Sequence, residues 1–399
     1  MPNRLAPLVL AGLFAAWSGG LLAAAADKFA GVPASQQPFI AQNEISGAVL
    51  LVANRERVLH LSAVGQGDVA TGRKMKTDDL FWIASMTKPI AAVCVAILAD
   101  AGKLSYDDAV EKYLPEFQQQ WRTEEQPPNR RHLVKVERPI TLRQLLTHTS
   151  GMANYPVTDP HWTLAEMTIV AAREPLGFPP GSRWGYSTAG IDALGRVVEV
   201  VSGMPFAAFL QQRLLDPLRM NHTTFWPTPG QDKRLARNYR KNPQSGKLEE
   251  TVITYLYGGA ITDRARPPLG GAGLFSTAED LSRFYQMLLN GGESGGQRIL
   301  KPQTVAEMTR NQIGELKARP GIVWGLGFNV VLEPKGMAAN ATLSPGSFGH
   351  GGAHGTNSWA DPARGLIYIY MIQRAGLPNA DDSEMRRAYQ EAVERALAR

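Results

Sequence analysis

Residues 81–90 read FWIASMTKPI and join a short apolar run to a pair of reactive side chains. Ser85 and Lys88 stand three residues apart at the start of a segment with helical periodicity, so both project from nearly the same face of the helix. A hydroxyl is a weak nucleophile until a base takes its proton, and a partly buried lysine is such a base when desolvation lowers its pKa. No other serine in the chain has a lysine three residues later. The stretch therefore predicts an activated serine at a helix N-terminus.

The sequence on both sides of this stretch predicts a sheet built from distant parts of the chain. Apolar runs that suit strands occur at residues 45–53 and 57–64 and again at residues 326–332 and 365–372. Between them helical periodicity dominates and strand signals nearly vanish. We therefore expect an α+β fold, in which a mostly antiparallel sheet is flanked by helices and a helical lobe of about residues 104–260 is inserted.

The first 26 residues are expected to be a signal peptide that is removed from the mature protein. They carry one positive charge at Arg4, then an apolar stretch, then small residues at positions 23–26. A retained membrane anchor is the alternative, because the apolar run is about long enough to span a bilayer. Cleavage leaves residues 27–399 as one secreted or periplasmic domain, which ends in an amphipathic helix at residues 382–399.

Composition and charge exclude several classes of partner. With 399 residues, 44% of them hydrophobic, the chain can bury a full core and is not disordered in character. Its 42 basic residues stand against 36 acidic ones and are spread thinly, so nucleic-acid binding is not expected. The single cysteine, Cys94, lies in an apolar helical run, so no intrachain disulfide can form.

Two rival kinds of hydrolytic site find little support in the sequence. His350 and His354 have the i, i+4 spacing of a zinc helix, but Gly351, Gly352 and Gly355 disfavour a helix there, and no acidic residue completes the site nearby. The nucleophile elbow of an α/β-hydrolase is not expected either. We therefore expect no metal and no cofactor, and a small-molecule or peptide substrate. The oligomeric state is not predicted.

Six motifs follow one another between about residues 45 and 373. They are FWIASMTKPI (81–90), GKLSYDDAVEKYLPEF (102–117), ITLRQLLTHTSGM (140–152), PPGSRWGYSTAG (179–190), GGAGLFSTAEDLSRFYQMLLNGG (270–292) and FGHGGAHGT (348–356). In this order they resemble the serine β-lactamase and penicillin-binding protein superfamily, on the branch of class C β-lactamases, DD-carboxypeptidases, D-aminopeptidases and esterases. The resemblance implies a β-lactamase/transpeptidase-like fold and a serine hydrolase that forms an acyl-enzyme on Ser85, with Lys88 as the activating group.

The resemblance assigns Tyr186-Ser187-Thr188 to the Tyr-x-Asn element of this family. It implies that Tyr186 is the general base or proton relay between Ser85 and the leaving group, with a pKa lowered by Lys88. Thr188 departs from the usual asparagine. Its hydroxyl can donate one hydrogen bond but lacks the amide that usually orients the lysine and a substrate amide.

The third element of the family, Lys-Thr-Gly, is replaced here by His350-Gly351-Gly352. By resemblance this segment is a sheet edge that lines the cleft, and the backbone N–H groups of Ala353 and Ser85 form the oxyanion hole. The glycines let the chain pass close to a substrate. The usual cation is thus a titratable histidine, and the usual hydroxyl is missing because Gly351 stands in its place.

These departures bear on the substrate. β-Lactams and D-Ala-D-Ala termini carry a carboxylate, which family members usually hold with the cation and hydroxyl of the third element, whereas an ester needs no such clamp. We therefore expect an esterase-like hydrolase of small esters or amides, with DD-peptidase or β-lactamase activity as the alternative. A penicillin-fold protein that binds without turnover is a third hypothesis, which the presence of Ser85, Lys88 and Tyr186 disfavours.

Overall fold

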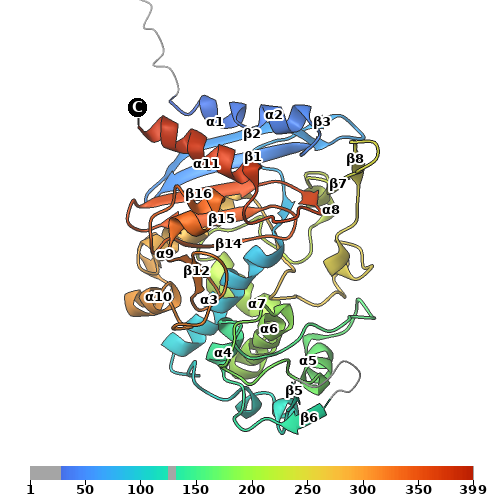
Figure 1. The fold of residues 1–399 in the computed structure, drawn as a ribbon, viewed down its shortest axis with the longest axis vertical. Coiled ribbons are helices and arrows are strands. Elements are labelled where there is room, and N and C mark those ends of the chain that lie inside the picture. Colours follow the sequence, from blue (N-terminus) through green and yellow to red (C-terminus); the bar gives the residue numbers. More distant parts are fainter. Residues whose placement is uncertain (1–27, 125–131, 399) are drawn as a thin grey trace, which may run out of the picture.

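The structure, a computed structural model, describes residues 28–124 and 132–398. Within that part, an eight-stranded antiparallel sheet joins the two ends of the chain, as Figure 1 shows. This arrangement confirms the predicted α+β fold with a mostly antiparallel sheet. In spatial order the strands are β12 (Ile322–Trp324), β13 (Asn329–Val331), β14 (Phe348–Gly351), β15 (Asn357–Asp361), β16 (Leu366–Met371), β1 (Gly47–Asn54), β2 (Val58–Asp68) and β3 (Arg73–Lys74).

Strand β1 is apolar on both faces because both faces of the sheet are covered. Alternate side chains of a strand point to opposite sides. Leu50 and Val52 therefore pack in one buried cluster with α1 (Gly31–Ala34) and α11 (Glu384–Leu397), while Leu51 packs in the main core with α9 (Ala278–Leu289). In Figure 1, α1, α2 (Gln37–Ala41) and α11 lie along the same side of the sheet. The sheet is thus the middle layer of three.

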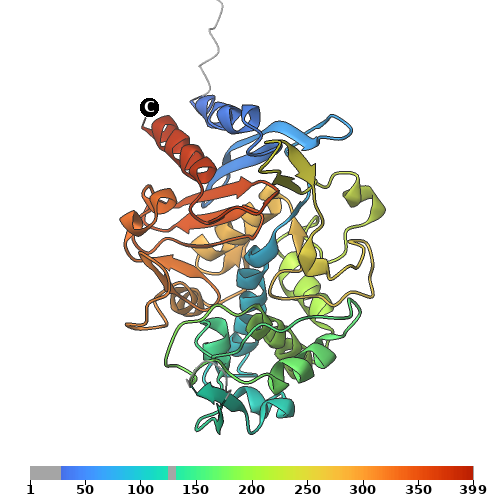
Figure 2. The same ribbon diagram turned by 45° about the vertical axis from the view of Figure 1, so that its right-hand side comes forward.

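Helix α3 (Thr87–Asp100) connects the sheet to the helical lobe and carries Lys88 in its first turn. Its sequence, TKPIAAVCVAILAD, is apolar all round, and every side chain from Thr87 to Leu98 is buried. Pro89 stands in the first turn, where its missing N–H breaks no intrahelical hydrogen bond. Cys94 is buried within this helix, as expected of a core residue. Figure 2 shows α3 running between the sheet and the lobe below it.

The segment expected to form a helical lobe contains helices and two short strand groups. Apolar patterning did not predict these strands, because they are only three or four residues long and largely polar or exposed. The helices are α4 (Leu142–Leu146), α5 (Leu164–Arg173), α6 (Thr188–Ser202), α7 (Phe206–Leu210) and α8 (Pro229–Asp232), and the strands are β5 (Trp121–Glu124), β6 (His132–Lys135), β7 (Tyr239–Lys241) and β8 (Leu248–Glu250).

The remaining elements are short apart from α9 and α11. They are α10 (Pro302–Met308), β4 (Phe81–Trp82) paired with β9 (Phe275–Ser276), β10 (Glu293–Ser294) paired with β11 (Gln297–Arg298), and β17 (Arg374–Ala375) beside β7.

The predicted signal peptide lies outside the described residues. Over residues 28–124 and 132–398, no single helix has the length and apolar character to cross a membrane; one pair bent by 80°, Thr188–Ser202 with Phe206–Leu215, meets those criteria jointly.

Candidate active site

Ser85 lies in a 3-10 turn, Ala84–Met86, that links β4 to α3. The preceding residue, Ala84, has a φ of 47°, a left-handed conformation that costs a non-glycine residue about 1 to 3 kcal/mol. Two backbone hydrogen bonds of Ile83 hold the turn. Ile83 N donates to Leu274 O at 3.0 Å, and Met86 N donates to Ile83 O at 3.0 Å. The turn leaves Ser85 half-buried at the positive end of α3.

Lys88 is completely buried and its amine meets three oxygen atoms. Its Nζ lies 3.2 Å from Oγ of Ser85, 3.3 Å from Oγ1 of Thr188 and 2.7 Å from the carbonyl oxygen of Gly271. Burial lowers the pKa of Lys88 to about 7; the negative charge of Asp192 opposes this shift and the positive charge of Arg319 adds to it. The uncharged, basic form of the amine is therefore available near neutral pH.

Tyr186 lies against the same amine, with Lys88 Nζ 4.7 Å from the centre of its ring. Desolvation raises the pKa of Tyr186 above its ordinary value, although a hydrogen bond with Ser85 acts in the opposite direction. The expectation that Lys88 lowers this pKa is wrong, because the cost of burying a phenolate is the larger effect. Tyr186 is thus a neutral phenol that can pass a proton on, rather than a standing phenolate base.

Thr188 is the first residue of α6, and its backbone is held by a residue from a distant loop. Asn154 Oδ1 accepts hydrogen bonds from the backbone N–H of Thr188 at 2.8 Å and of Ala189 at 3.2 Å. One turn further along α6, the buried Asp192 accepts the N–H of Gly271 at 2.8 Å. Sequence reasoning did not select Asp192, although an acidic side chain on the apolar face of a helix was a signal that could have identified it.

His350 lies on β14, buried to 2% exposure, with Nδ1 2.7 Å from the carbonyl oxygen of Gly351. A carbonyl oxygen only accepts, so Nδ1 carries the ring proton and Nε2 carries a lone pair. Among the described residues Nε2 has no hydrogen-bond partner. Burial, followed by the charge of Lys88, lowers the pKa of His350 to about 3. The expected titratable cation is therefore an uncharged ring at neutral pH.

The two glycines after His350 are surrounded closely, each by a different partner. A Cβ built on Gly351 would lie 1.7 Å from Oδ1 of Asp381, so a carboxylate fills the space of a side chain at this position. A Cβ built on Gly352 would lie 2.7 Å from the carbonyl oxygen of Ile83. The end of β14 thus approaches the nucleophile turn, and the exposed Ala353 follows at once.

An aromatic group that the sequence analysis did not assemble surrounds the tyrosine. The ring of His148 lies 4.5 Å from that of Tyr186, and its Nδ1 accepts the backbone N–H of Ser187 at 3.2 Å. Trp324 lies 5.9 Å from Tyr186 and 5.7 Å from His350. These residues come from segments far apart in the sequence, so local patterning gave no signal of their meeting.

A cavity of about 890 Å³ lies beside the segment of residues 251–262. Leu235, Ile253 and Leu256 line it, and all three belong to a buried cluster that also contains Trp82 and Ala84. The cavity thus shares a buried cluster with the turn that carries the nucleophile. Its lining is mixed, since Asp232, Arg237 and Glu250 also contribute to it.

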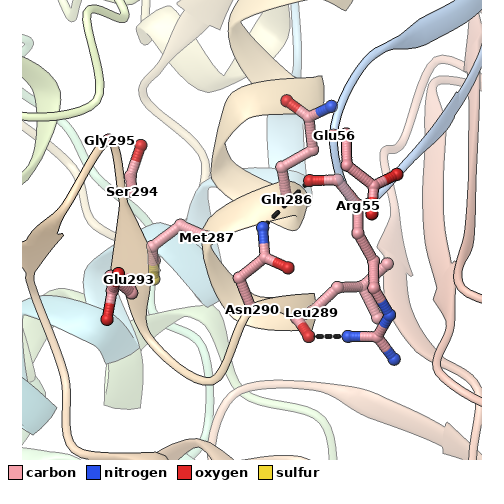
Figure 3. A pocket seen from close by; sticks show the side chains of 9 residues that line it. All are labelled: Arg55, Glu56, Gln286, Met287, Leu289, Asn290, Glu293, Ser294 and Gly295. Carbon is pink, nitrogen blue, oxygen red and sulfur yellow. Dashed lines mark hydrogen bonds between the residues drawn. The ribbon is translucent and has the colours of Figure 1, made fainter.

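A second, polar pocket of about 470 Å³ is lined by Glu293, Ser294 and Gly295, the central residues of a G-x-S-x-G sequence, GESGG at residues 292–296 (Figure 3). Its serine, Ser294, lies on the β10–β11 hairpin rather than on the strand-to-helix turn of a nucleophile elbow, and no histidine lines the pocket. Arg55 there donates to the carbonyl oxygens of Leu289 and Pro362, which joins the β1–β2 turn to α9. The described residues also contain no group of three or more His, Cys, Asp or Glu side chains arranged for a metal ion.

Comparison with known proteins agrees with this architecture. The sequence profile of the family described as Beta-lactamase matches residues 32–394. Esterase EstB of Burkholderia gladioli is 30% identical over 364 residues, which cover 84% of this chain and 87% of that protein. A putative D-alanyl-D-alanine carboxypeptidase of Escherichia coli (strain K12) is 27% identical over 358 residues, 83% of this chain and 79% of its own length.

A solved structure gives the same answer. EstCE1, described as a hydrolase with promiscuous acyltransferase activity, superposes with a TM-score of 0.76 at 26% identity and covers 92% of this chain and 98% of its own. The predicted resemblance is thereby confirmed. The chain belongs to the β-lactamase family and is a serine hydrolase of the β-lactamase fold.

Proposed function

We propose that the protein is exported and hydrolyses small esters through an acyl-enzyme on Ser85. The observation that carries the preference for esters is the state of His350. Its Nδ1–H is donated to the carbonyl oxygen of Gly351 and burial lowers its pKa to about 3, so at neutral pH the ring is uncharged and Nε2 carries a lone pair. Such a group repels a carboxylate rather than binding it. An ester without a carboxylate loses nothing at this position.

The proposed first step is attack of Ser85 Oγ on the carbonyl carbon. The uncharged amine of Lys88 has two N–H groups, for Gly271 O and Thr188 Oγ1, and one lone pair, which accepts the proton of Ser85. A carbon–oxygen bond forms, and the π electrons of the carbonyl move onto its oxygen. The product is a tetrahedral oxyanion beside a protonated Lys88.

Collapse of this intermediate breaks the bond to the leaving alkoxide and leaves the acyl group on Ser85. Tyr186 gives its phenolic proton to the alkoxide and takes the proton held by Lys88, so both groups return to their starting states. Water then attacks the acyl carbon, and its proton passes to the same pair. Release of the acid returns the proton to Ser85.

The oxyanion is proposed to lie between the backbone N–H groups of Ser85 and Ala353. The close approach of Gly352 to the Ile83 carbonyl oxygen supports this placement, because it joins the turn after β14 to the turn that carries the nucleophile. Each donor is worth about 3 to 4 kcal/mol in the transition state.

The decisive experiment is an activity screen of the purified mature protein with p-nitrophenyl esters, nitrocefin and a D-Ala-D-Ala peptide. We expect the short-chain esters to be hydrolysed much faster than the other two. Nitrocefin or peptide turnover equal to ester turnover would overturn the ester preference and favour the β-lactamase or DD-peptidase alternative. The relative described as a putative D-alanyl-D-alanine carboxypeptidase is the reason to include the peptide.

A fluorophosphonate label separates an enzyme from a protein that only binds. We expect one adduct per chain, located on Ser85 by mass spectrometry of the digested protein. A lack of any adduct would favour a penicillin-fold binding protein. N-terminal sequencing of the protein recovered after expression in a bacterium checks the proposed export, for which we expect a mature chain that starts near Asp27.

A further inference from the structure

Arg319 and Asp381 form an ion pair beside Tyr186 and the end of β14. Arg319 precedes β12, and Asp381 lies between β17 and α11, so two distant segments meet there. Their side chains are 31% and 19% exposed, which leaves the pair within reach of a bound molecule. The backbone of Asp381 is itself anchored, because the fully buried Arg386 donates to its carbonyl oxygen.

The cation of this pair lies over the ring of Tyr186, one of the proposed catalytic residues, and over two tryptophan rings. The Arg319 guanidinium carbon is 5.8 Å from the ring centre of Tyr186 and 5.9 Å from those of Trp184 and Trp324. A guanidinium above aromatic faces is attracted by the ring quadrupoles, which holds it in place. Its planar array of N–H donors is suited to a carboxylate. Arg319 is thus placed to bind a substrate carboxylate, and Asp381 already engages it.

The carboxylate of Asp381 fills the space that a side chain at position 351 would occupy. Oδ1 of Asp381 lies 1.7 Å from the position that a Cβ would take on Gly351, the residue that follows His350. Oδ1 of Asn357 lies 2.9 Å from the same position and has no hydrogen-bond partner among the described residues. A carboxylate brought to this edge by a substrate would therefore meet the partly exposed Asp381, while the acceptor oxygen of Asn357 and Nε2 of His350, both buried, supply no cation there.

We propose that Asp381 is a built-in carboxylate that occupies the anion-binding position of Arg319 and so restricts hydrolysis to substrates without a negative charge on this side of the cleft. This inference rests on the proposed ester hydrolase and names its substrate class. A substrate anion has to displace Asp381 from Arg319 and leave a second negative charge beside it. An uncharged ester leaves the ion pair intact.

The experiment compares two p-nitrophenyl esters of the same acid, p-nitrophenyl hydrogen succinate with a free carboxylate and p-nitrophenyl methyl succinate without one. The readout is the ratio of their kcat/KM values, anionic over neutral. We expect a low ratio in the wild type and a rise on the order of tenfold in Asp381→Asn, because Arg319 becomes free for a charge-assisted hydrogen bond. The rise shrinks as salt is added, because the pair is partly exposed.

Two further variants assign the effect to the pair. In Asp381→Asn combined with Arg319→Gln, the ratio returns to about the wild-type value. Asp382→Asn removes the same charge one residue away, where Asp382 Oδ1 accepts the N–H of Ala339 at 2.7 Å and leaves Arg319 unaffected, so it serves as the matched control with an unchanged ratio. Circular dichroism and fluorophosphonate labelling establish that each variant is folded and carries a reactive serine.

The outcomes are distinct from those of the proposed function. A wild type that hydrolyses neither ester contradicts the ester hydrolase itself. A wild type that hydrolyses the neutral ester, with an unchanged ratio in Asp381→Asn, overturns only the role of Asp381. A raised anionic-to-neutral ratio that persists in the double variant also overturns the role of Asp381. So does a specific loss of kcat/KM for a trimethylammonium ester in Asp381→Asn, because Asp381 would then bind cationic substrates.

Discussion

The two edges of the cleft are built in opposite ways. On the α3 edge, Ser85 and Lys88 come from one short motif, and the amine is fixed by three oxygen atoms within 3.3 Å. On the β14 edge, His350 is uncharged with an unpartnered Nε2, and the space beside Gly351 is filled by a side chain from a distant segment. The comparison teaches that the nucleophile and its base come from one motif whose amine is held by partners from distant segments, Thr188 and Gly271, whereas the β14 edge presents no cation to a substrate.

The largest effect is expected on the α3 edge. Ser85→Ala should reduce ester turnover by roughly 10⁴-fold or more, because the nucleophile and its base act as one unit whose losses are not additive. Lys88→Ala in the Ser85→Ala background should add little further loss. Both are measured as kcat/KM with a p-nitrophenyl ester. Wild-type turnover in Ser85→Ala, with the label also retained, would contradict the assignment of the nucleophile.

The pH dependence of turnover distinguishes the two edges directly. Only the uncharged amine of Lys88 accepts a proton, and its pKa is lowered to about 7, so kcat/KM should rise with pH through that region and fall about tenfold per unit below it. His350→Gln should leave this acid limb in place, because the pKa of His350 is already near 3. Asp192→Asn should move the limb to lower pH, since the charge of Asp192 raises the pKa of Lys88. A limb that disappears in His350→Gln would assign it to the histidine.

Crowding at the β14 edge predicts an effect on stability. Gly351→Thr forces a side chain into the carboxylate of Asp381 and should lower the free energy of unfolding by about 1 to 3 kcal/mol, measured by urea denaturation. Asp381→Ala makes room, so Gly351→Thr should cost less in that background than in the wild type. Equal costs in both backgrounds would mean that Asp381 is not the obstacle.

The smallest effect is expected for Thr188, which replaces an asparagine of the family element. Thr188→Val keeps the branched shape but removes the oxygen 3.3 Å from Lys88 Nζ, and we expect a loss of about 0.5 to 1.5 kcal/mol in transition-state stabilisation, or roughly two- to twelvefold in kcat/KM. Thr188→Ser is the control that keeps the hydroxyl and most of the activity. A loss comparable to that of Lys88→Ala would mean that Thr188 takes part in proton transfer.

Much of the fold followed from local patterns because the relevant signals were local. The helix predicted at residues 382–399 contains α11, and the strand predicted at residues 365–372 contains β16. Apolar patterning missed β14 and β15, although both are buried, because FGHG and NSWAD lack the alternation of apolar residues on which strand prediction depends. Their pairing in the centre of the sheet, rather than their composition, makes them strands. The family resemblance placed His350 at a sheet edge, but β14 is an interior strand that pairs with both β13 and β15.

The candidate site divides in the same manner. Ser85 and Lys88 stood out because one motif carries both reactive groups at short spacing, Tyr186 was implied by the family resemblance, and the structure brings the three together. Arg319 and Asp381 gave no such signal, since the two residues are 62 positions apart and each is ordinary in its own segment. The uncharged state of His350 could not be predicted from the sequence either, because it depends on burial of the ring in the fold. Its tautomer depends on which ring nitrogen lies beside the Gly351 carbonyl oxygen.

The pairing of β1 with β16 has a consequence for biosynthesis. β1 lies near the start of the chain, but its partner is not complete until residue 371 has been made, and the turn that carries Ala353 emerges only shortly before. The ribosome therefore releases the nucleophile helix long before the strands that enclose it. Closure of the sheet requires a contact across almost the whole polypeptide, which slows folding and exposes apolar edges in the meantime. A nascent chain that stalls before this strand holds the serine and its lysine but cannot complete the sheet, so catalytic competence is acquired only after residue 371 has been made.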